Sequence, residues 1–410
     1  MSIRILHVLD HSWPVLDGYS NRSRSLIAAQ KSLGWHPVVV TSPLHNLDDP
    51  QAQDLVLDFV NYYRVPSSSS WTWKAIYRRW PGLREFSVVN LLEKTLSRIL
   101  AREKFDLIHA HSPALCGLAA SRVAAAAGIP FVYEIRSFWE DGLPQKPTSL
   151  RYRLTRFLET RVAKRANAVV GIARPILKDL ASRGVPEQKL FLVPNGVDVA
   201  RFAPREYDRA LSKELNLEDT PTLGFIGTFF PWEGVSWLVQ ATAALHARGV
   251  LSKLLIIGDG AEADAVRAAI QQEQAEGFVS YLGRVPHEDI ERYYSILDVL
   301  VYPRRSSRIT EMVTPLKPLE AMALGKAVLG SDVGGIRELI EPETTGLLFA
   351  SGEIDDFCRQ ATRLLQDENL RSVMGKNARA RVCAERDWAT VTERYRKVYE
   401  FAMTTSLERR

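Results

Sequence analysis

The fold of this chain is decided by the stretch VTPLKPLEAMALGKAVLGSDVGGIRELI, residues 313–340. Pro318 predicts the start of a helix, because proline at the first helical position gives up no hydrogen bond that the helix needs. Gly325 predicts the end of that helix. A short apolar strand follows at 327–329, and the glycine pair at 334–335 opens a second helix. A buried strand between two helices indicates an α/β domain with a parallel sheet.

The start of the first predicted helix has the properties of a ligand site. Glu320 lies in its first turn, and Lys317 stands between Pro315 and Pro318. Free backbone N–H groups and the positive end of a helix attract phosphate, and a fixed carboxylate accepts hydrogen bonds from vicinal hydroxyls. This combination suits a sugar nucleotide. The simpler alternatives are a surface cation at Lys317 and helix stabilisation by Glu320.

The rest of the chain alternates strands and helices. Helices expected at 22–33, 91–103 and 235–247 separate strands that are apolar throughout, which is typical of parallel sheets covered on both faces. The strand candidates are IRILHVLD, HPVVVTS, FDLIHAHS, PFVYEIR, NAVVGIA, KLFLVPN, TLGFIGT, KLLIIGDG, FVSYLG, VLVYP and KAVLGSD. They predict an α/β protein with two doubly wound, Rossmann-like parallel-sheet domains.

The domain boundaries follow from the point where the alternation restarts. After the polar segment 204–221, the strand and helix pattern begins afresh near Thr222. We therefore expect an N-terminal domain over 1–205, a C-terminal domain over 206–385, and a helix over 386–410 that packs back toward the first domain. Ligands in such folds bind beyond the carboxyl ends of the strands, so the two sheets are expected to face each other across a cleft.

Cationic and aromatic residues are unevenly distributed. The chain has 410 residues, 25% of them charged, and a net charge of +5. Basic side chains among aromatic ones suit an anionic membrane surface, and a solvated face or surface loop is the alternative. No recognition motif for nucleic acid accompanies the charge, so nucleic acid is not an expected partner. The residues concerned are Tyr62, Tyr63, Arg64, Trp71, Trp73, Lys74, Tyr77, Arg78, Arg79, Trp80 and Arg84, and a second run, Arg151, Arg153, Arg156, Arg161, Lys164 and Arg165.

The same sequence gives an expected location. No window is long and apolar enough to span a membrane, and the first residues, MSIRILHVLD, resemble a β-strand more than a signal peptide. We expect a cytoplasmic protein that contacts the inner face of the cell membrane peripherally.

The transfer of a sugar from a nucleotide requires cations. Its leaving group is a diphosphate, on which negative charge grows as the glycosidic bond breaks, so contacts that strengthen at that moment lower the barrier. Lys317 is the best single candidate. Arg304 and Arg308 follow the strand VLVYP and join Lys317 if the loop 304–316 folds back. Glu311 on this loop is a candidate for contact with the sugar.

The first half of the chain offers candidates after its strands. FDLIHAHSP places His111 before a Ser-Pro turn, where its side chain is expected to point into a loop and either bind a sugar hydroxyl or help accept a proton. A structural histidine is the alternative. Gly18 allows a diphosphate or acceptor to approach the backbone closely, and Tyr19 follows it. Glu134 and Arg136 either meet the acceptor or form a buried ion pair.

These segments resemble the family-4 retaining glycosyltransferases, which have the two-domain GT-B fold. VPNGVDVARF (193–202) looks like the interdomain motif of that family. LLIIGDGAE, YLGRVPHEDIERYYSILDVLVYP, and SDVGGIRELI followed by TGLLF also fit it in order and spacing. The resemblance covers nearly the whole chain. Two segments, VYPRRSSRITEMVTPLKPLEAMA and YEIRSFWEDG, further resemble a subgroup associated with bacterial exopolysaccharide and exosortase gene clusters.

The resemblance implies a hexosyltransferase that uses a nucleoside-diphosphate sugar and a lipid-linked or polysaccharide-precursor acceptor, with retention of anomeric configuration and with no metal or other cofactor. It assigns the acceptor to the first domain and the donor to the second. It makes Glu320 the ribose ligand and places Arg284 and Val285 near the base. The candidate catalytic residues are His111, Lys317, Arg308 and Glu311; the donor-binding candidates are Gly18, Gly227, Thr228, Arg284, Val285, Arg304, Thr314, Leu316 and Glu320; the acceptor-side candidates are Tyr19, Glu134 and Arg136.

Two positions of the family pattern are altered. The earlier member of the family's glutamate pair falls on Met312 here, with Glu311 beside it. The Arg and Lys of the family's Gly-Arg-x-x-x-x-Lys-Gly loop are replaced by Thr228 and Glu233. We hypothesise that other cations supply the missing positive charge, namely Arg304, Arg308 and Lys317.

Other functions compete with sugar transfer. A sugar-nucleotide epimerase of similar architecture needs no acceptor, and a non-catalytic sugar-nucleotide-binding protein needs no turnover. A glycosidase requires two carboxylates that flank the scissile bond, and no such pair is identifiable. A metal-dependent transferase is disfavoured, because the sequence contains no Asp-x-Asp pair to hold a divalent ion against a diphosphate.

Overall fold

The computed structural model describes residues 2–15, 17–46, 54–65, 81–142, 147–218, 220–286 and 288–407. The chain forms two compact units, unit 1 from Met1–Pro194 with Trp388–Arg410, and unit 2 from Asn195–Asp387. The division therefore falls before the expected boundary at 205. The reason is that Asn195 donates a hydrogen bond to the carbonyl of Thr314, and Val197 pairs with Asp387. Both contacts tie the start of the predicted linker to unit 2.

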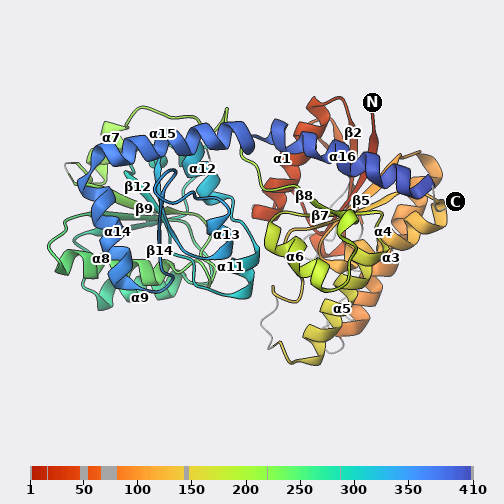
Figure 1. Ribbon diagram of the computed structural model, residues 1–410, viewed down its shortest axis with the longest axis horizontal. Helices are drawn as coiled ribbons and strands as arrows, with labels where there is room; N and C mark the ends of the chain where they lie inside the picture. The colour runs from red at the N-terminus through yellow and green to blue at the C-terminus, as the bar shows by residue number, and fades with distance from the viewer. Residues whose placement is uncertain are drawn as a thin grey trace. The chain divides into compact units, whose positions relative to one another are not determined.

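Unit 1 is built around a parallel sheet (Figure 1). Its strands lie in the order β3-β4-β2-β1-β5-β6-β7-β8, and only β3 runs antiparallel to its neighbour. The elements are β1 (Arg4–Leu9), α1 (Gly18–Ser32), β2 (His36–Thr41), η1 (Pro43–Asn46), β3 (Leu55–Leu57), β4 (Val60–Arg64), α3 (Pro81–Arg102), β5 (Leu107–His111), α4 (Ala114–Ala127), β6 (Phe131–Ile135), α5 (Leu150–Arg165), β7 (Ala168–Gly171), α6 (Arg174–Ser182), η2 (Glu187–Lys189), β8 (Leu190–Leu192) and α16 (Trp388–Leu407).

The C-terminal helix α16 completes the core of unit 1. Its apolar side chains recur at helical spacing and are buried in one cluster with Ile5, Leu107 and Val132 of the sheet. The contributing residues of α16 are Trp388, Val391, Tyr395, Val398, Tyr399 and Ala402. The last helix of the chain therefore covers the sheet formed by the first half.

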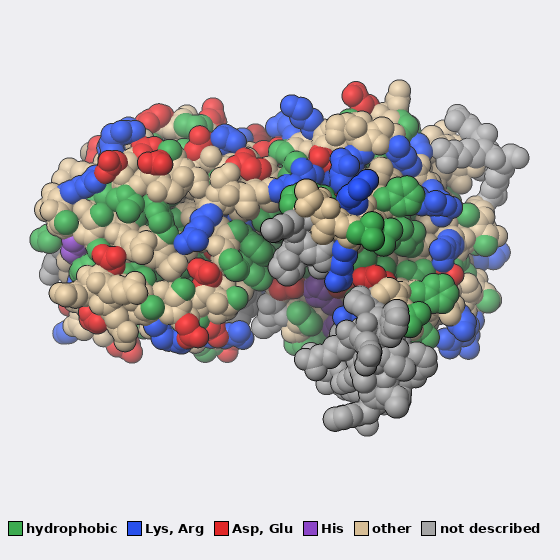
Figure 2. All heavy atoms as spheres, turned by 90° about the horizontal axis from the view of Figure 1, so that it is seen from below, with side chains coloured by type: hydrophobic (Ala, Val, Ile, Leu, Met, Phe, Trp, Pro, Cys, Tyr) green, Lys and Arg blue, Asp and Glu red, His purple; other side chains and the backbone are tan. Residues whose placement is uncertain are grey.

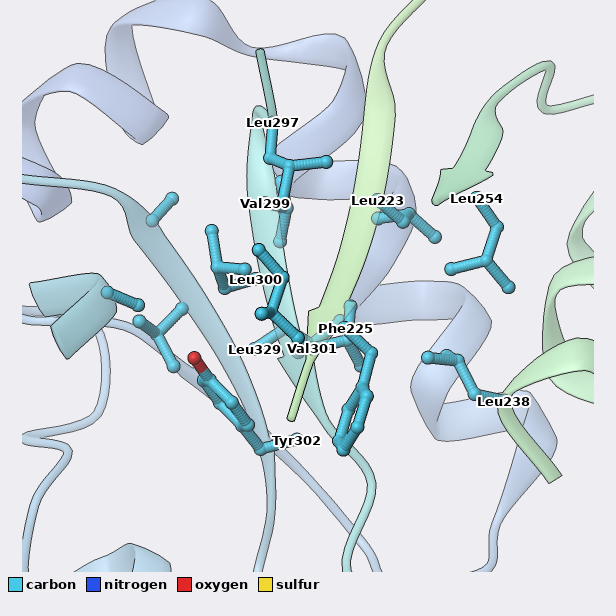
Figure 3. Close-up of a cluster of buried hydrophobic side chains, with 14 of the residues drawn as sticks. Leu223, Phe225, Leu238, Leu254, Leu297, Val299, Leu300, Val301, Tyr302 and Leu329 are labelled. Carbon is cyan, nitrogen blue, oxygen red and sulfur yellow. The ribbon is translucent and has the colours of Figure 1, made fainter. Parts of the chain in front are cut away.

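Unit 2 contains a fully parallel sheet in the order β11-β10-β9-β12-β13-β14. Its central strands are buried on both faces, and their leucine and valine side chains pack against those of the helices (Figure 3). The elements are α7 (Arg209–Glu214), β9 (Thr222–Ile226), α8 (Val235–Ala247), β10 (Lys253–Ile257), α9 (Ala263–Gln272), β11 (Val279–Gly283), α10 (Ile290–Ser295), β12 (Val299–Tyr302), α11 (Arg308–Met312), α12 (Lys317–Ala323), β13 (Ala327–Ser331), α13 (Gly334–Arg337), β14 (Leu347–Phe349), α14 (Ile354–Gln366) and α15 (Glu368–Glu385).

The predicted α/β class with two Rossmann-like parallel sheets is confirmed. The second series of alternating strands and helices contains the expected strand start at Thr222, the first residue of β9. Within residues 313–340, α12 begins at Lys317, one residue before Pro318, and Gly325 ends it with a left-handed φ of 71°. The apolar strand is longer than expected, as β13 extends to Ser331.

The strand order places ligand sites in both units. In each sheet the order changes direction between two central strands, β1 and β5 in unit 1 and β9 and β12 in unit 2. The loops that leave such a pair at the carboxyl end run to opposite sides, which leaves a crevice where ligands bind in open α/β sheets. The loops after these four strands are therefore the first places to look for function.

One glycine contact tests the packing of unit 2. A Cβ on Gly375 of α15 would lie 2.0 Å from the carbonyl oxygen of Gly325. In an uncrowded helix Gly→Ala stabilises by up to about 1 kcal/mol, but overpacking typically costs about 1–3 kcal/mol. We expect Gly375→Ala to lower the free energy of unfolding of unit 2, measured by urea denaturation. Gly277→Ala is the control, because nothing lies within 4 Å of its Cβ position. A variant Gly375→Ala as stable as this control would contradict the packing.

Candidate functional site

A cluster of three charged side chains lies beyond the carboxyl ends of β9 and β12 in unit 2. The Glu233 carboxylate lies 3.2 Å from Lys317 Nζ and 3.5 Å from a terminal nitrogen of Arg304. Lys317 Nζ also donates a hydrogen bond to the carbonyl of Thr228 at 3.0 Å. The side chain of Arg304 is only 4% exposed, whereas that of Lys317 is 19% exposed. Lys317 is therefore the member of the cluster that reaches solvent.

Two glycines allow this cluster to form. Gly227 has a φ of 143°, and a Cβ there would come within 2.3 Å of Lys317 Cε. Gly234 has a φ of 72°, and its Cβ would come within 2.2 Å of the carbonyl of Pro303. Only glycine permits these conformations and close approaches. The loop after β9 therefore lies directly against Lys317 and the end of β12.

The loop after β12 folds back as hypothesised. Arg304 donates a hydrogen bond to the carbonyl of Val313 at 3.0 Å, which closes the segment between them. This brings Arg304 and Lys317 to the same carboxylate. Arg308 is the first residue of α11, and its side chain is exposed.

The three charges set one another's ionisation. Burial alone would raise the pKa of Glu233, but Lys317 and Arg304 lower it below its ordinary value. Burial lowers the pKa of Lys317, and Glu233 opposes that change. The carboxylate thus remains charged at neutral pH and carries one negative charge beside two positive ones. The cluster keeps a net positive charge that an anion can use.

Glu320 lies on the same short helix as Lys317. It accepts a hydrogen bond from the Tyr294 hydroxyl at 3.3 Å, and Tyr302 donates to the carbonyl of Lys317 at 2.9 Å. These two tyrosines fix α12 against α10 and β12. Burial raises the pKa of Glu320 to about 7. Its carboxyl group therefore changes charge in the physiological range.

Two predicted site residues of the loop serve as structural links. Glu311 accepts hydrogen bonds from the amide of Gly334 at 2.7 Å and from Arg337 at 3.2 Å, so it holds the start of α13. Thr314 is buried, and its carbonyl and hydroxyl both accept from the side-chain amide of Asn195. In this structure both are engaged in packing the loop.

The remaining donor candidates of unit 2 lie in its loops and at a helix start. Thr228 is exposed directly after Gly227, and Leu316 is the N-cap residue of α12. Arg284 follows β11 and pairs with Asp259 at 3.2 Å with its side chain largely exposed. Val285 is half-buried against the core.

The unit 1 candidates meet around one buried carboxylate. Glu134 accepts hydrogen bonds from Arg22 Nε at 3.1 Å and from Arg136 Nε at 2.9 Å. The Tyr395 hydroxyl of α16 donates to its second oxygen. Burial alone would raise the pKa of Glu134, but Arg22, with His111 and Arg136, lowers it well below its ordinary value. Of the two expectations for Glu134 and Arg136, the buried ion pair is the one the structure contains.

The expectation that His111 points into a loop is wrong. Its side chain is fully buried, with Nε2 3.0 Å from His7 Nδ1 and Nδ1 2.9 Å from Arg136. Successive side chains of a strand point to opposite faces of the sheet, so the last residue of β5 can point into the core. His111 does so and meets its charged partners, Arg136 and Glu134, inside unit 1. Burial is the main reason that the pKa of His111 falls to about 4 and that of His7 to about 3, so both rings are neutral at pH 7.

The hydrogen-bond partners fix which ring nitrogens carry protons. His7 Nε2 faces the side-chain oxygen of Gln30 at 2.8 Å, so it must be the donor, and Nδ1 must accept from His111. His111 Nδ1 then accepts from Arg136. Gln30 donates to the Tyr399 hydroxyl, which is free to donate to His109 Nδ1 at 3.0 Å. A continuous chain of donors thus links α1, β1, β5 and α16.

Among the described residues, His7, His109 and His111 form a group with the spacing of metal ligands, with ligand atoms within 4.8 Å of one another. The lone-pair nitrogen of each ring already accepts a hydrogen bond in this chain of donors. The group therefore fits a packed polar core better than a metal centre.

A cavity of about 710 Å³ lies at the carboxyl ends of β1 and β5 in unit 1. Asp10, His11, Tyr19 and Ser112 are among its lining residues. His11 sits between Asp10 at 3.0 Å and Asp17 at 2.8 Å. Burial alone would lower the pKa of His11, but its hydrogen bonds to the two carboxylates raise it to about 9. Gly18 is exposed as the first residue of α1, beside this cavity wall.

Sequence reasoning missed the partners of the predicted residues. Glu233 was noticed as an altered family position, but nothing in the pattern shows that it binds both Arg304 and Lys317. His11 carries a visible signal, since it follows Asp10 at the end of a predicted strand and Asp17 lies in the same loop. Tyr395 and Tyr399 carry none, because their spacing is that of an ordinary packed helix.

The first basic and aromatic run is only partly described. Tyr62, Tyr63 and Arg64 belong to β4, and Arg64 is buried with hydrogen bonds to Ser12 and to the carbonyl of Trp13. The expectation that Arg64 is part of a membrane-facing run is therefore wrong. Trp71, Trp73, Lys74, Tyr77, Arg78, Arg79 and Trp80 lie outside the described residues. The second run does form a helix, α5.

The buried carboxylate of unit 1 yields a prediction. Glu134→Gln removes the negative charge that faces Arg22 and Arg136, and breaking a buried ion pair costs about 3–5 kcal/mol. We expect this loss in the free energy of unfolding of unit 1, measured by urea denaturation. Glu393→Gln is the control, because Glu393 pairs with Arg396 on the surface and exposed pairs contribute at most about 1 kcal/mol. Equal stability of the two variants would contradict the role of Glu134.

Comparison with known proteins agrees with this architecture. Residues 17–196 match the family described as glycosyl transferase 4-like domain, and residues 208–381 match the family described as glycosyl transferases group 1. A GDP-mannose-dependent alpha-mannosyltransferase of Mycobacterium tuberculosis is 26% identical over 407 residues, which cover 97% of this chain and 96% of that protein.

A second relative names both of its substrates. The UDP-Gal:alpha-D-GlcNAc-diphosphoundecaprenol alpha-1,3-galactosyltransferase of Escherichia coli is 25% identical over 308 residues, 73% of this chain and 76% of its own length. Among solved structures, sucrose-phosphate synthase from Thermosynechococcus elongatus superposes with a TM-score of 0.79 at 21% identity and covers 98% of this chain and 100% of its own. The chain therefore belongs to the family-4 glycosyltransferases with the GT-B fold.

Proposed function

We propose that this protein transfers a hexose from a nucleoside-diphosphate sugar to a lipid-linked or polysaccharide-precursor acceptor, with retention of anomeric configuration and without a bound metal ion. The proposal is supported chiefly by one observation, the Lys317 ammonium group held by Glu233 at the mouth of the unit 2 crevice. The names of the two relatives add support, since both use nucleoside-diphosphate sugars.

Lys317 is the proposed contact for the diphosphate. It is more exposed than Arg304, and its nitrogen lies beside the loop carbonyl of Thr228. As the bond from the anomeric carbon to the phosphate oxygen breaks, the leaving group gains negative charge that a nearby ammonium stabilises. Arg304 acts as a positioning residue, because its buried guanidinium fixes Glu233 and Val313. The backbone N–H groups near Leu316 and Lys317 add further donors.

The rest of the donor is assigned by the same geometry. Glu320 lies one helical turn beyond Lys317 and accepts hydrogen bonds from the ribose hydroxyls. Arg284 and Val285, after β11, border the base. Because Glu311 is engaged with Gly334, we assign it the task of holding the sugar-side loop in place.

The acceptor is proposed to bind unit 1. The cavity beside Asp10 and His11 is large enough for a sugar and carries charged and aromatic lining residues. His111 and Glu134 act indirectly by holding Arg136, which packs on the ring of Tyr19 at the cavity wall. Two sequence segments that resemble an exopolysaccharide-associated subgroup favour an acceptor of that pathway class, at the inner face of the cell membrane.

A panel of sugar nucleotides tests the function. UDP-glucose, UDP-galactose and GDP-mannose are compared by thermal shift, since a ligand of the native state raises its melting temperature. Turnover of the stabilising donor, with a glycoside as product, supports transfer. Interconversion of the donor without acceptor identifies an epimerase, and binding without any turnover identifies a non-catalytic protein.

The first prediction from this assignment concerns Lys317. Loss of a group that stabilises charge in the transition state lowers kcat by about 10²–10³-fold. We expect Lys317→Ala to show this loss in initial-rate assays with saturating donor. Arg305→Ala is the matched control, because Arg305 is an exposed cation on the same loop. A Lys317→Ala variant with the rate of this control would reject the assignment.

The second prediction concerns pH. Glu320 has a pKa of about 7, so it is mainly protonated at pH 6 and mainly ionised at pH 8. The ionised form is the better acceptor for ribose hydroxyls, so donor affinity should rise by about tenfold from pH 6 to pH 8. Isothermal titration with a sugar nucleotide, whose diphosphate does not titrate in this range, measures the change. Glu320→Gln should bind weakly with no such rise. A wild-type profile that is flat or falls with pH would contradict the role of Glu320.

A further inference from the structure

Exposed apolar side chains gather on two helices of unit 1, α3 and α5, which are linked near their starts by an ion pair. Among the described residues, twelve large hydrophobic side chains are exposed, and five of them lie on α3 and α5. Leu150 is the most exposed of these five, at 81%. Exposed apolar groups that cluster in this way mark an interaction surface, whereas isolated ones do not. The five are Leu83 and Phe86 of α3 and Leu150, Leu154 and Phe157 of α5.

The exposed residues of α5 form one stripe. Leu150, Leu154 and Phe157 are spaced by four and three residues, which places them on one face of a helix. The residues that α5 buries are Thr155, Glu159, Val162 and Ala163, on the opposite face. The helix thus has two apolar-bearing faces, and only one of them packs on unit 1.

The exposed side of α5 is also strongly cationic. Its arginines and lysine flank the apolar stripe, and its acidic residue, Glu159, is buried on the inner side. Within the described ranges, no acidic side chain pairs with Arg153 or Arg156. Figure 2 shows blue cationic and green hydrophobic side chains interspersed over the unit at the right. The exposed cations are Arg151, Arg153, Arg156, Arg161, Lys164 and Arg165.

The two helices are joined at the edge of the unit 1 cavity. Arg151 at the start of α5 pairs with Glu85 near the start of α3 at 3.4 Å. Arg84, Glu85 and Arg151 are all cavity-lining residues. Leu83 and Leu150 are their direct chain neighbours and are exposed. The cavity rim therefore carries two arginines next to apolar side chains.

We propose that the exposed face of α3 and α5 docks on an anionic lipid surface and so presents the cavity rim to it. Apolar side chains enter the interface while the flanking arginines attract negatively charged headgroups, which is the chemistry of interfacial amphipathic helices. The described residues include no helix that could cross a membrane. A second part of the proposal rests on the proposed function. In it, Arg84 and Arg151 contact the phosphates of a lipid-linked acceptor whose sugar enters the cavity.

Vesicle flotation of the full chain tests the docking. Vesicles of phosphatidylcholine alone are compared with vesicles in which about a quarter of the lipid is phosphatidylglycerol. We expect the protein to float with the anionic vesicles at low salt, and to bind them less as salt screens the arginines. Failure to float with anionic vesicles at low salt would overturn the proposal.

Variants assign the binding to this face. The triple variant Leu150→Ser/Leu154→Ser/Phe157→Ser should reduce the vesicle-bound fraction at least about tenfold, because three inserted side chains are lost together. Arg153→Gln/Arg156→Gln should weaken binding to anionic vesicles only. The matched control is Leu251→Ser/Val373→Ser, two exposed apolar residues of unit 2, which should float as the wild type does. All variants are first required to retain the wild-type melting temperature.

The outcomes separate the docking from the proposed function. Flotation needs neither donor nor acceptor, so a protein that floats but turns over no sugar nucleotide keeps the docking surface and loses the function. Light scattering of the triple variant tests the alternative that this face binds a second copy of the chain. If this variant floats normally but converts a dimer to a monomer, the face is a protein interface and the lipid proposal is overturned.

Discussion

A single buried carboxylate, that of Glu233, organises the charged cluster of unit 2. Two cations share it, and neither Arg304 nor Lys317 would be held at its present position by burial alone, because isolated buried charges are costly. The family pattern has a lysine where Glu233 stands, and an arginine where Thr228 stands. Compared with that pattern, the loop after β9 lacks both cations and carries an acid, Glu233, which pairs with Arg304 and Lys317. Local charge reverses at that position while the net charge of the crevice stays positive.

The two sheets have the same arrangement of central strands. Each has a pair of central strands whose loops diverge, and charged groups lie beyond the carboxyl ends of each pair. In unit 2 these are Lys317 and its partners; in unit 1 they are Asp10 and His11 at the cavity. Beneath the cavity, Glu134 and its arginines form a polar core that the last helix of the chain completes through Tyr395 and Tyr399. Removal of that helix would take the Tyr395 hydroxyl from Glu134 and the Tyr399 hydroxyl from His109, so α16 is part of the interior of unit 1.

Much of the fold was accessible from the sequence because its signals are local. The apolar strands, the helix start at Pro318, the stop at Gly325 and the restart at Thr222 each depend on a few neighbouring residues. The site was accessible in part. Lys317 and Glu320 were found from the helix start, and Arg304 from its strand end. What could not be predicted depends on contacts between distant segments. Examples are the contacts of the buried His111 with Arg136 and His7, and the hydrogen bonds from Asn195 to Thr314. Spacing carries no information on such contacts. The family resemblance supplied roles, but not the altered partners of Glu233.

We propose that Lys317 and Glu320 together hold a nucleoside diphosphate. A crystal structure of the protein with its stabilising nucleotide tests this most directly. We expect a diphosphate oxygen within hydrogen-bond distance of Lys317 Nζ and a ribose hydroxyl on the Glu320 carboxylate. A nucleotide bound elsewhere, with Lys317 still paired to Glu233 and Glu320 in contact only with Tyr294, would contradict it.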